Sequence, residues 1–364
     1  MAPSKVYFTN FHTTLQENRQ QKLARLLLVA GMDQLPVENR YVAIKIHFGE
    51  PGNLAYLRPN YAKTVVDLIK QMGGKPFLTD CNTLYVGGRK NALDHIESAY
   101  VNGFTPYSTG CHILIGDGLK GTDEVEVPVN GEYVKNAKIG RAIMDADVVI
   151  SLSHFKGHEM TGFGGALKNL GMGCGSRAGK MDMHCDGKPL VKEHLCVGCG
   201  NCRKICAHDA PTIVDRKMHI DTSKCVGCGR CIAVCPTDAI ASPDDSSEQT
   251  LCYKIAEYTK AVVQGRPAFH ISIVNEVSPN CDCHGENDVP LISDIGMFAS
   301  FDPVALDQAC ADACNRVCRN KDAAFLGEDE DLFKAAHPNT DGYDQIRHAK
   351  KIGLGTDEYE LIEI

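Results

Sequence analysis

The 364-residue sequence lacks any apolar run long enough to cross a membrane, and its first ten residues lack the apolar stretch of a signal peptide. It also lacks an excess of positive charge, because 38 Lys and Arg stand against 46 Asp and Glu, a net charge of -8. Nucleic-acid binding requires a basic face, so this balance argues against nucleic acid as the main partner. We therefore expect a cytoplasmic protein with neither a membrane nor a nucleic-acid partner.

Cysteine, in contrast, is abundant, with 18 residues. Cytoplasmic thiols are kept reduced and structural disulfides are uncommon there, so this number indicates metal ligation or redox chemistry. Eight of the cysteines form two runs, each with the spacing C-x2-C-x2-C-x3-C. The first run is Cys196, Cys199, Cys202 and Cys206, and the second is Cys225, Cys228, Cys231 and Cys235.

This spacing is that of bacterial ferredoxins with two [4Fe-4S] clusters, in which the fourth cysteine of each run ligates the other cluster. The ligand sets that we expect are therefore crossed between the runs. One set is Cys196, Cys199, Cys202 and Cys235, and the other is Cys225, Cys228, Cys231 and Cys206. Zinc is the alternative, but zinc sites usually pair C-x2-C units without a third and fourth cysteine in register.

The two runs also repeat in their other residues, since Cys-Val-Gly-Cys-Gly begins at Cys196 and again at Cys225. The glycines allow the backbone to approach the cluster closely, and amide hydrogens then stabilise its negative charge. We expect an inserted α+β ferredoxin-like domain over residues 188–243 that exchanges electrons with a redox partner protein.

Outside this insertion, short β-rich apolar runs alternate with helical patterns, which predicts an α/β body with a mainly parallel sheet and crossover helices. The body would comprise residues 1–187 and 244–364. The expected strands are residues 5–8, 41–48, 75–79, 112–115, 147–152 and 268–274. The expected helices are residues 15–30, 59–72, 89–102, 248–264 and 303–319.

Polar, titratable residues follow several of the expected strands, and ligands bind beyond the carboxyl ends of the strands in such a sheet. A single residue of this kind is more often an ordinary loop residue, but several at one rim indicate a site. We expect His47, Asp80 and His154 to line one cavity, where imidazole and carboxylate can bind metal or transfer protons. The candidate catalytic residues are His47, Asp80, His154, Lys156 and His158.

A glycine-rich, basic segment spans residues 161–180. Its amides, together with Lys168, Arg177 and Lys180, could hold the carboxylate or phosphate of an anionic small molecule. The segment matches neither the dinucleotide-binding motif nor the P-loop, so a purely structural glycine loop is the alternative.

The remaining cysteines are of two kinds. Cys310, Cys314 and Cys318 continue a row at helical spacing, which is typical of a buried core. Cys281 and Cys283 stand in the run Cys-Asp-Cys-His, which can chelate a soft metal as a third metal site or form a redox pair. Inert reduced thiols are the alternative.

Six further runs of the sequence are distinctive: residues 46–52, 78–85, 153–158, 162–173, 280–284 and 294–307. They resemble the iron–sulfur proteins of the family called domain of unknown function 362. The resemblance covers nearly the whole chain and implies an α/β body with an inserted two-cluster ferredoxin module, without supplying a substrate.

Together, these patterns favour an iron–sulfur oxidoreductase that passes electrons through two [4Fe-4S] clusters to a small-molecule or metal site in the α/β body. One alternative is a non-catalytic electron-transfer subunit that docks on a partner enzyme. Another is a lyase or isomerase whose clusters are structural. A substrate pocket would favour the enzyme, and a large exposed apolar patch beside a cluster would favour the docking subunit.

Overall fold

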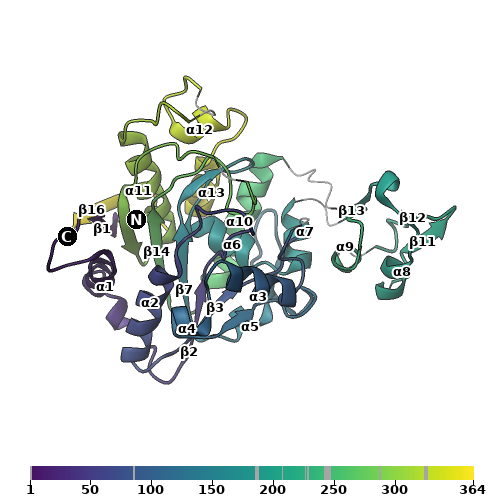
Figure 1. Cartoon of the computed structure of the whole chain (residues 1–364), viewed down its shortest axis with the longest axis horizontal. Coiled ribbons are helices and arrows are strands. Elements are labelled where there is room, and N and C mark those ends of the chain that lie inside the picture. The colour runs from purple at the N-terminus through teal and green to yellow at the C-terminus, as the bar shows by residue number, and fades with distance from the viewer. Residues whose placement is uncertain are drawn as a thin grey trace.

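An eight-stranded sheet forms the centre of the molecule (Figure 1). The computed structural model describes residues 2–84, 87–184, 188–206, 208–225, 227, 229–241, 247–286, 288–323 and 327–364, with the backbone alone at Ala233. The strand order is β16-β1-β15-β14-β7-β2-β3-β4. In that order the strands are Tyr359–Glu363, Ser4–Asn10, Gly296–Ser300, Ala268–Val274, Val148–His154, Tyr41–Lys45, Lys75–Asp80 and Ile113–Ile115.

The sheet is mainly parallel, as the alternation of strand and helix patterns predicts. Only β15 among the described strands of this sheet runs antiparallel to both of its neighbours, β1 and β14. All six strands that were expected from the sequence are present, with small shifts of their ends. The sequence reasoning missed β15 and the edge strand β16, because β15 is five buried residues of mixed propensity and β16 is half exposed.

Helices cover both faces of the sheet, and alternate residues of each strand supply the two cores. On β7, Ile150 and Leu152 pack under one face, whereas Val149 packs under the other. The first face is covered by α1 (Arg19–Val29), α2 (Pro59–Gln71) and α3 (Ala92–Val101). The second is covered by α6 (Ala166–Cys174), α10 (Glu248–Val263), α11 (Pro303–Arg316) and α13 (Tyr343–Lys351).

Capping residues explain why two helices begin later in the chain than the sequence pattern predicts. Helix α1 begins at Arg19 because Asn18 and Gln21 form a capping box, so Leu15 stays exposed outside the helix. Helix α3 begins at Ala92 because the Asn91 side chain accepts from the first free backbone N–H groups. In each case the side chain satisfies donors that have no partner within the helix.

Shorter elements complete the body. Two hairpins are β5 (Glu124–Pro128) with β6 (Asn136–Gly140), and β8 (Lys156–His158) with β9 (Gly162–Gly164). The short helices are η1 (Met32–Gln34), α4 (Pro106–Thr109), α5 (Arg141–Met144) and α12 (Leu332–Ala336), and α7 (Arg177–His184) follows α6. None of the described helices has both the length and the apolar character needed to cross a membrane.

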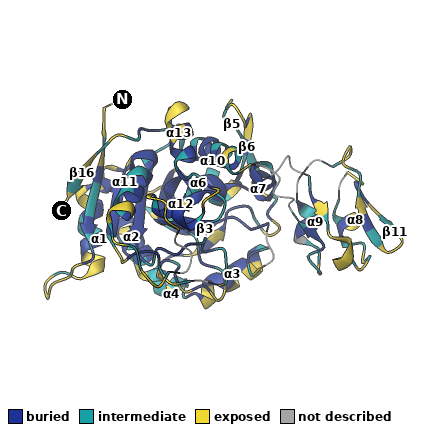
Figure 2. Cartoon of the chain, turned by 90° about the horizontal axis from the view of Figure 1, so that it is seen from above, coloured by how far each residue is buried: buried dark blue, intermediate teal, exposed yellow. Residues whose placement is uncertain are grey.

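The cysteine-rich segment forms small elements of its own. Strand β10 (Leu190–Val191) pairs with β13 (Ile240–Ala241), and β11 (Pro211–Val214) pairs with β12 (Lys217–Ile220). The helices are η2 (Glu193–Leu195), α8 (Asn201–Ile205) and α9 (Arg230–Ala233). Figures 1 and 2 show this segment at one end of the molecule, with α7 on the side of the body that faces it.

Candidate functional site

A cavity of about 60 Å³ lies where the carboxyl ends of β2, β3 and β7 meet. His47, Asp80 and His154 all line it, so the structure brings these three residues together. Lys156 and Lys168 also line it, and so do Cys281 and Cys283 of the loop that follows β14.

Asp80 is the last residue of β3 and is buried among cations. Its Oδ1 lies 3.1 Å from the Nζ of Lys45, and its Oδ2 lies 3.7 Å from the Nε2 of His95. Burial opposes ionisation of this carboxyl group, but the charge of Lys45, followed by that of His95, outweighs it and lowers the pKa of Asp80. Asp80 is therefore ionised at neutral pH and fixes the Lys45 side chain at the cavity.

His47 lies beside N–H groups of two residues, and its neutral ring can accept a hydrogen bond at only one nitrogen. Its Nδ1 accepts from the backbone N–H of Gly49 at 3.0 Å, and its Nε2 lies 2.8 Å from Nη1 of Arg89. Burial, and then the charge of Arg89, lowers the pKa of His47 to about 3, so the imidazole is neutral.

Arg89 was not found by the sequence reasoning, because it follows no strand end and reaches the cavity only in the folded chain. Its Nε donates to Glu50 at 2.7 Å, whereas its buried Nη2 has no hydrogen-bond partner among the described residues. A buried N–H group that points to no acceptor is rare in folded proteins. At a cavity wall, it is suited to an anionic ligand.

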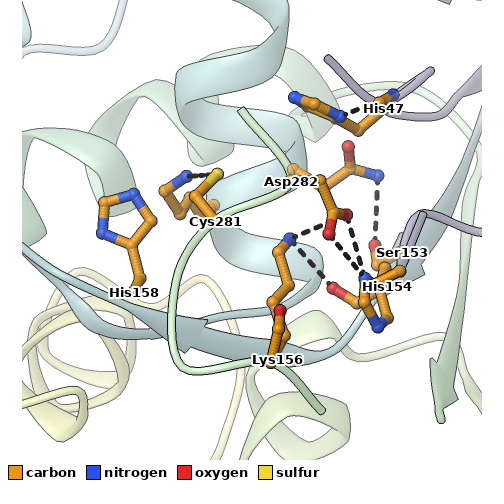
Figure 3. Close-up of polar contacts among 12 residues, drawn as sticks. His47, Ser153, His154, Lys156, His158, Cys281 and Asp282 are labelled. Carbon is orange, nitrogen blue, oxygen red and sulfur yellow. Dashed lines mark hydrogen bonds and ion pairs between the residues drawn. The ribbon is translucent and has the colours of Figure 1, made fainter. Parts of the chain in front are cut away.

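His154 contacts protein oxygens through both ring nitrogens. Its Nδ1 lies 2.9 Å from Oδ2 of Asp282 (Figure 3). Its Nε2 lies 2.7 Å from the carbonyl oxygen of Asn275. Lys156 lies 3.8 Å from the same Asp282 oxygen. Because both nitrogens are occupied, His154 fixes the loop that carries Asp282 and presents no ring nitrogen to a metal in the cavity.

Cys281, in the loop that follows β14, has side-chain hydrogen bonds with both Lys168 and His158. The Nδ1 of His158 accepts from two backbone N–H groups that follow it, so its proton is on Nε2, which hydrogen-bonds with Cys281. Lys168 donates to Cys281 Sγ at 3.3 Å. A hydrogen bond from the Cys283 thiol, together with the Lys168 charge, lowers the pKa of Cys281 well below its usual range in spite of burial.

Three potential metal ligands meet beside Cys281. Glu159, Cys283 and His284 each offer one ligand atom, and these atoms lie within 4.8 Å of one another. The sequence reasoning named Cys283 but assigned no role to Glu159. A signal was present, since Glu159 directly follows the His158 that was singled out.

The anion-binding residues expected in the glycine-rich segment separate into two places. Lys168 and Lys180 line the cavity. Arg177 does not, because its guanidinium donates to the backbone carbonyls of Lys120, Thr83 and Lys90. The described Arg177 donors therefore fasten α7 to neighbouring loops, and an anion-binding role of Arg177 stays a prediction.

The described cysteines of the two runs line two small cavities in the cysteine-rich segment. One cavity, of about 20 Å³, is lined by Cys196, Cys199, Cys202 and Cys235. The other, of about 30 Å³, is lined by Cys206, Cys225 and Cys231. Cys228 lies outside the described residues. The described cysteines therefore group across the two runs, with the fourth cysteine of each run beside the other run.

Glycines in left-handed conformations shape both cavities. Gly198 and Gly200 have φ angles of 70° and 77°, and their repeats Gly227 and Gly229 have 70° and 63°. Other residue types rarely adopt this conformation, so the repeat of Cys-Val-Gly-Cys-Gly is also a repeat of backbone geometry.

The second of these cavities lies against the body. A Cβ atom added to Gly229, which lines that cavity, would come 2.8 Å from Cγ of Arg177 on α7. Lys90 of the body also forms an ion pair with Asp238. Helix α7 therefore contacts the cysteine-rich segment through Arg177, while Lys180 of the same helix lines the body cavity.

The cysteine row on α11 is only partly buried. Cys310 and Cys314 lie in the core, as expected. Cys318 is exposed, so this part of the prediction is wrong. The helix ends at Arg316, and Val317 has an extended backbone, so Cys318 no longer lies on the same helical face.

Comparisons with known proteins give a family and several distant likenesses. A curated thylakoid-associated protein of Synechocystis sp. is 27% identical over 124 residues, which cover 34% of this chain and 35% of that protein. A crystal structure of a Thermotoga maritima protein aligns at 12% identity with a TM-score of 0.41, covering 82% of this chain and 58% of that one. The lactate racemase apoprotein of Thermoanaerobacterium thermosaccharolyticum aligns at 11% identity with a TM-score of 0.32, covering 75% and 51%.

The chain thus spans about a third of the curated relative and little more than half of the solved structures. The family model described as "Domain of unknown function (DUF362)" matches residues 42–312, which include the cavity and the cysteine-rich segment. The chain therefore belongs to the DUF362 family.

Proposed function

We propose that the chain is an iron–sulfur oxidoreductase that carries electrons through two [4Fe-4S] clusters to the cavity in the α/β body. The clusters would be held in an inserted ferredoxin-like domain, residues 188–243, between the two parts of the body, 1–187 and 244–364. The observation that carries the proposal is the crossed grouping of the cysteines around two cavities. Two-cluster ferredoxins need this grouping, whereas zinc sites formed within each run would not.

The residues around the two cavities fit such clusters chemically. Each cubane needs four thiolates, and the glycines with positive φ allow backbone amides to approach its sulfides. When bound, a [4Fe-4S] cluster supplies one electron at a time. The ligand set of the second cavity would be completed by Cys228.

Helix α7 supports the electron route from the second cluster to the body. Its residue Arg177 contacts Gly229 beside that cluster, and its residue Lys180 lines the body cavity. A cluster at Cys206, Cys225 and Cys231 would therefore be the nearer one to the body. The cluster at Cys196 and its partners would face an external redox partner protein.

The body cavity favours an anionic substrate. Lys156, Lys168 and Lys180 line it together with Arg89, whose buried Nη2 lacks a partner among the described residues. Carboxylates and phosphates pair with such groups through charge-assisted hydrogen bonds. The neutral imidazole of His47 lies beside Arg89, where it can hold or transfer a proton of the bound anion.

Metal analysis of anaerobically purified protein tests the proposal. We expect about eight iron and eight acid-labile sulfide per chain, the content of two cubanes. Replacing Cys199 by Ala should remove about half of both, whereas Cys318→Ala, at an exposed cysteine outside the runs, should remove none. Zinc without sulfide in the wild-type protein would reject the clusters. Full cluster content in a protein that reduces no anionic acceptor would favour the docking subunit.

A further inference from the structure

We propose that Glu159, Cys281, Cys283 and His284 bind one divalent cation of the Zn²⁺ or Fe²⁺ class at the wall of the cavity. The inference deepens the proposed function, because it names the centre in the body that the clusters would serve. It rests on residues outside the cysteine-rich segment, so the two proposals can fail separately.

Three of the four proposed ligand atoms already lie close together, and the fourth, from Cys281, is joined to them through Cys283. Those of Glu159, Cys283 and His284 lie within 4.8 Å of one another, and the thiols of Cys281 and Cys283 share a hydrogen bond. Two thiolates, one imidazole and one carboxylate make a four-ligand set that is typical of tetrahedral Zn²⁺ or Fe²⁺. Magnesium and calcium would require a set made mainly of oxygen atoms.

His284 is oriented as a metal-binding histidine usually is. Its Nδ1 lies 3.1 Å from Oε1 of Glu286, while its Nε2 lies 3.2 Å from Oε1 of Glu159. A carboxylate that accepts the proton of one ring nitrogen fixes the other nitrogen as the ligand atom. Glu286 is thus a positioning residue, and Nε2 is the atom that faces the proposed ion.

The charges around the site match a bound cation with two thiolates. Two thiolates and one carboxylate exceed the charge of a divalent ion by one negative charge. Lys168, whose Nζ is 3.3 Å from Cys281 Sγ, supplies the balancing positive charge. A buried charge needs such a partner to be tolerated.

The loop is held rigidly at both sides of the motif, as a preorganised site requires. Its Pro279 carbonyl approaches Gly157 so closely that a Cβ there would come 2.2 Å from the oxygen. The Asn53 side chain donates to the carbonyl oxygen of His284 at 2.9 Å. The backbone N–H of Glu50 donates to the carbonyl oxygen of Asp282, also at 2.9 Å. These contacts fix residues 281–284, which carry three of the four proposed ligands.

The experiment counts metal that does not belong to cubanes. Anaerobic protein is loaded with Zn²⁺ alone, freed of excess by gel filtration, and analysed for zinc, iron and acid-labile sulfide. Because a [4Fe-4S] cluster contains equal iron and sulfide, the sum of zinc and iron minus sulfide gives the extra ions. We expect about one extra ion per chain in the wild-type protein and in Cys318→Ser. We expect almost no extra ion in the Cys283→Ser variant, and almost none in the double variant Glu159→Gln/His284→Gln.

A spectroscopic measurement adds a second readout. Loading with Co²⁺ should produce a thiolate-to-cobalt absorption band in the difference spectrum of the wild type, and this band should be lost in Cys283→Ser. Unchanged sulfide content would show that the variants are folded.

The proposal is overturned if the wild type holds no extra ion. It is also overturned if Cys283→Ser retains the ion, or if mass spectrometry finds a Cys281–Cys283 disulfide as the resting state. Extra metal without sulfide would keep this site and reject the clusters.

Discussion

The Nζ of Lys168 lies 3.3 Å from Sγ of Cys281 at the wall of the cavity. Burial alone would lower the pKa of Lys168, but the negative charge of the Cys281 thiolate raises it. The ammonium group is therefore charged where a metal-bound thiolate would need compensation.

Replacing Lys168 by Met should weaken Zn²⁺ binding at this site by about 10-fold to 100-fold, the range seen when an outer partner of a metal ligand is lost. Lys168→Arg keeps the positive charge and should retain most of the affinity. Competition with a chromophoric chelator measures both. Equal affinities of wild type and Lys168→Met would separate Lys168 from the metal site.

Anion binding should depend on the guanidinium group of Arg89. Arg89→Lys keeps the charge beside Glu50 but loses the planar fork of donors, so its Nη2 can no longer meet a carboxylate or phosphate. We expect acetate and inorganic phosphate to bind the variant about 10-fold more weakly than the wild type, as measured by calorimetry. Identical affinities would place the anion elsewhere.

Gly157 should tolerate no side chain. A Cβ atom there would come 2.2 Å from the carbonyl oxygen of Pro279, which is backbone and cannot rotate away. We expect Gly157→Ala to lower the free energy of unfolding by about 3 kcal/mol, the upper end of overpacking costs. Gly265→Ala is the control, because open space surrounds it and only its positive φ costs about 1–2 kcal/mol. Chemical denaturation measures the free energy of unfolding of both variants. Equal decreases would mean that the loop containing Pro279 shifts and relieves the clash.

Stability should decrease in acid partly through His270. This residue of β14 is buried, its Nδ1 lies 3.0 Å from the Ser151 hydroxyl, and burial lowers its pKa to about 3. Because the unfolded imidazole has a pKa of about 6.5, the unfolded chain binds the proton first as pH falls. The full contribution is present above pH 6.5 and declines by about 1.4 kcal/mol per pH unit as pH falls toward 3.

Thermal unfolding at pH 7.5 and pH 5.5 measures this decline. In His270→Gln the difference between the two midpoints should be smaller than in the wild type, although other buried histidines keep it above zero. A pH dependence identical to that of the wild type would mean that His270 is not titrated on unfolding.

Local sequence signals predicted much of the fold. The apolar runs at β2, β3, β7 and β14 gave strands whose carboxyl ends share one rim, and this was enough to bring His47, Asp80 and His154 together. The direction of β15 could not be predicted in this way, because hydrophobic periodicity indicates that a strand exists and not which way it runs.

The contacts within the site could not be predicted from local signals. Asp282 pairs with His154 across 128 positions of the chain, and Arg89 reaches His47 from a loop. Cysteine spacing was more informative, because the ferredoxin pattern itself implies which residues from different runs share a ligand set. Helical spacing was less informative at Cys318. It predicted a buried residue, but α11 ends at Arg316, earlier than expected, and Cys318 is exposed.

The crossed ligand sets can be tested by pairs of substitutions. If Cys206 and Cys225 belong to one cluster, replacing both by Ala should leave the other cluster intact, with about four iron and four sulfide per chain. Replacing Cys225 and Cys235 by Ala would instead remove one ligand from each cluster, although both cysteines lie in the same run.

Iron and sulfide analysis of the two anaerobically purified variants is the most direct measurement. We predict that Cys206→Ala/Cys225→Ala keeps about half of the wild-type content and that Cys225→Ala/Cys235→Ala keeps almost none; the reverse order, or zinc in place of iron and sulfide, would contradict the account.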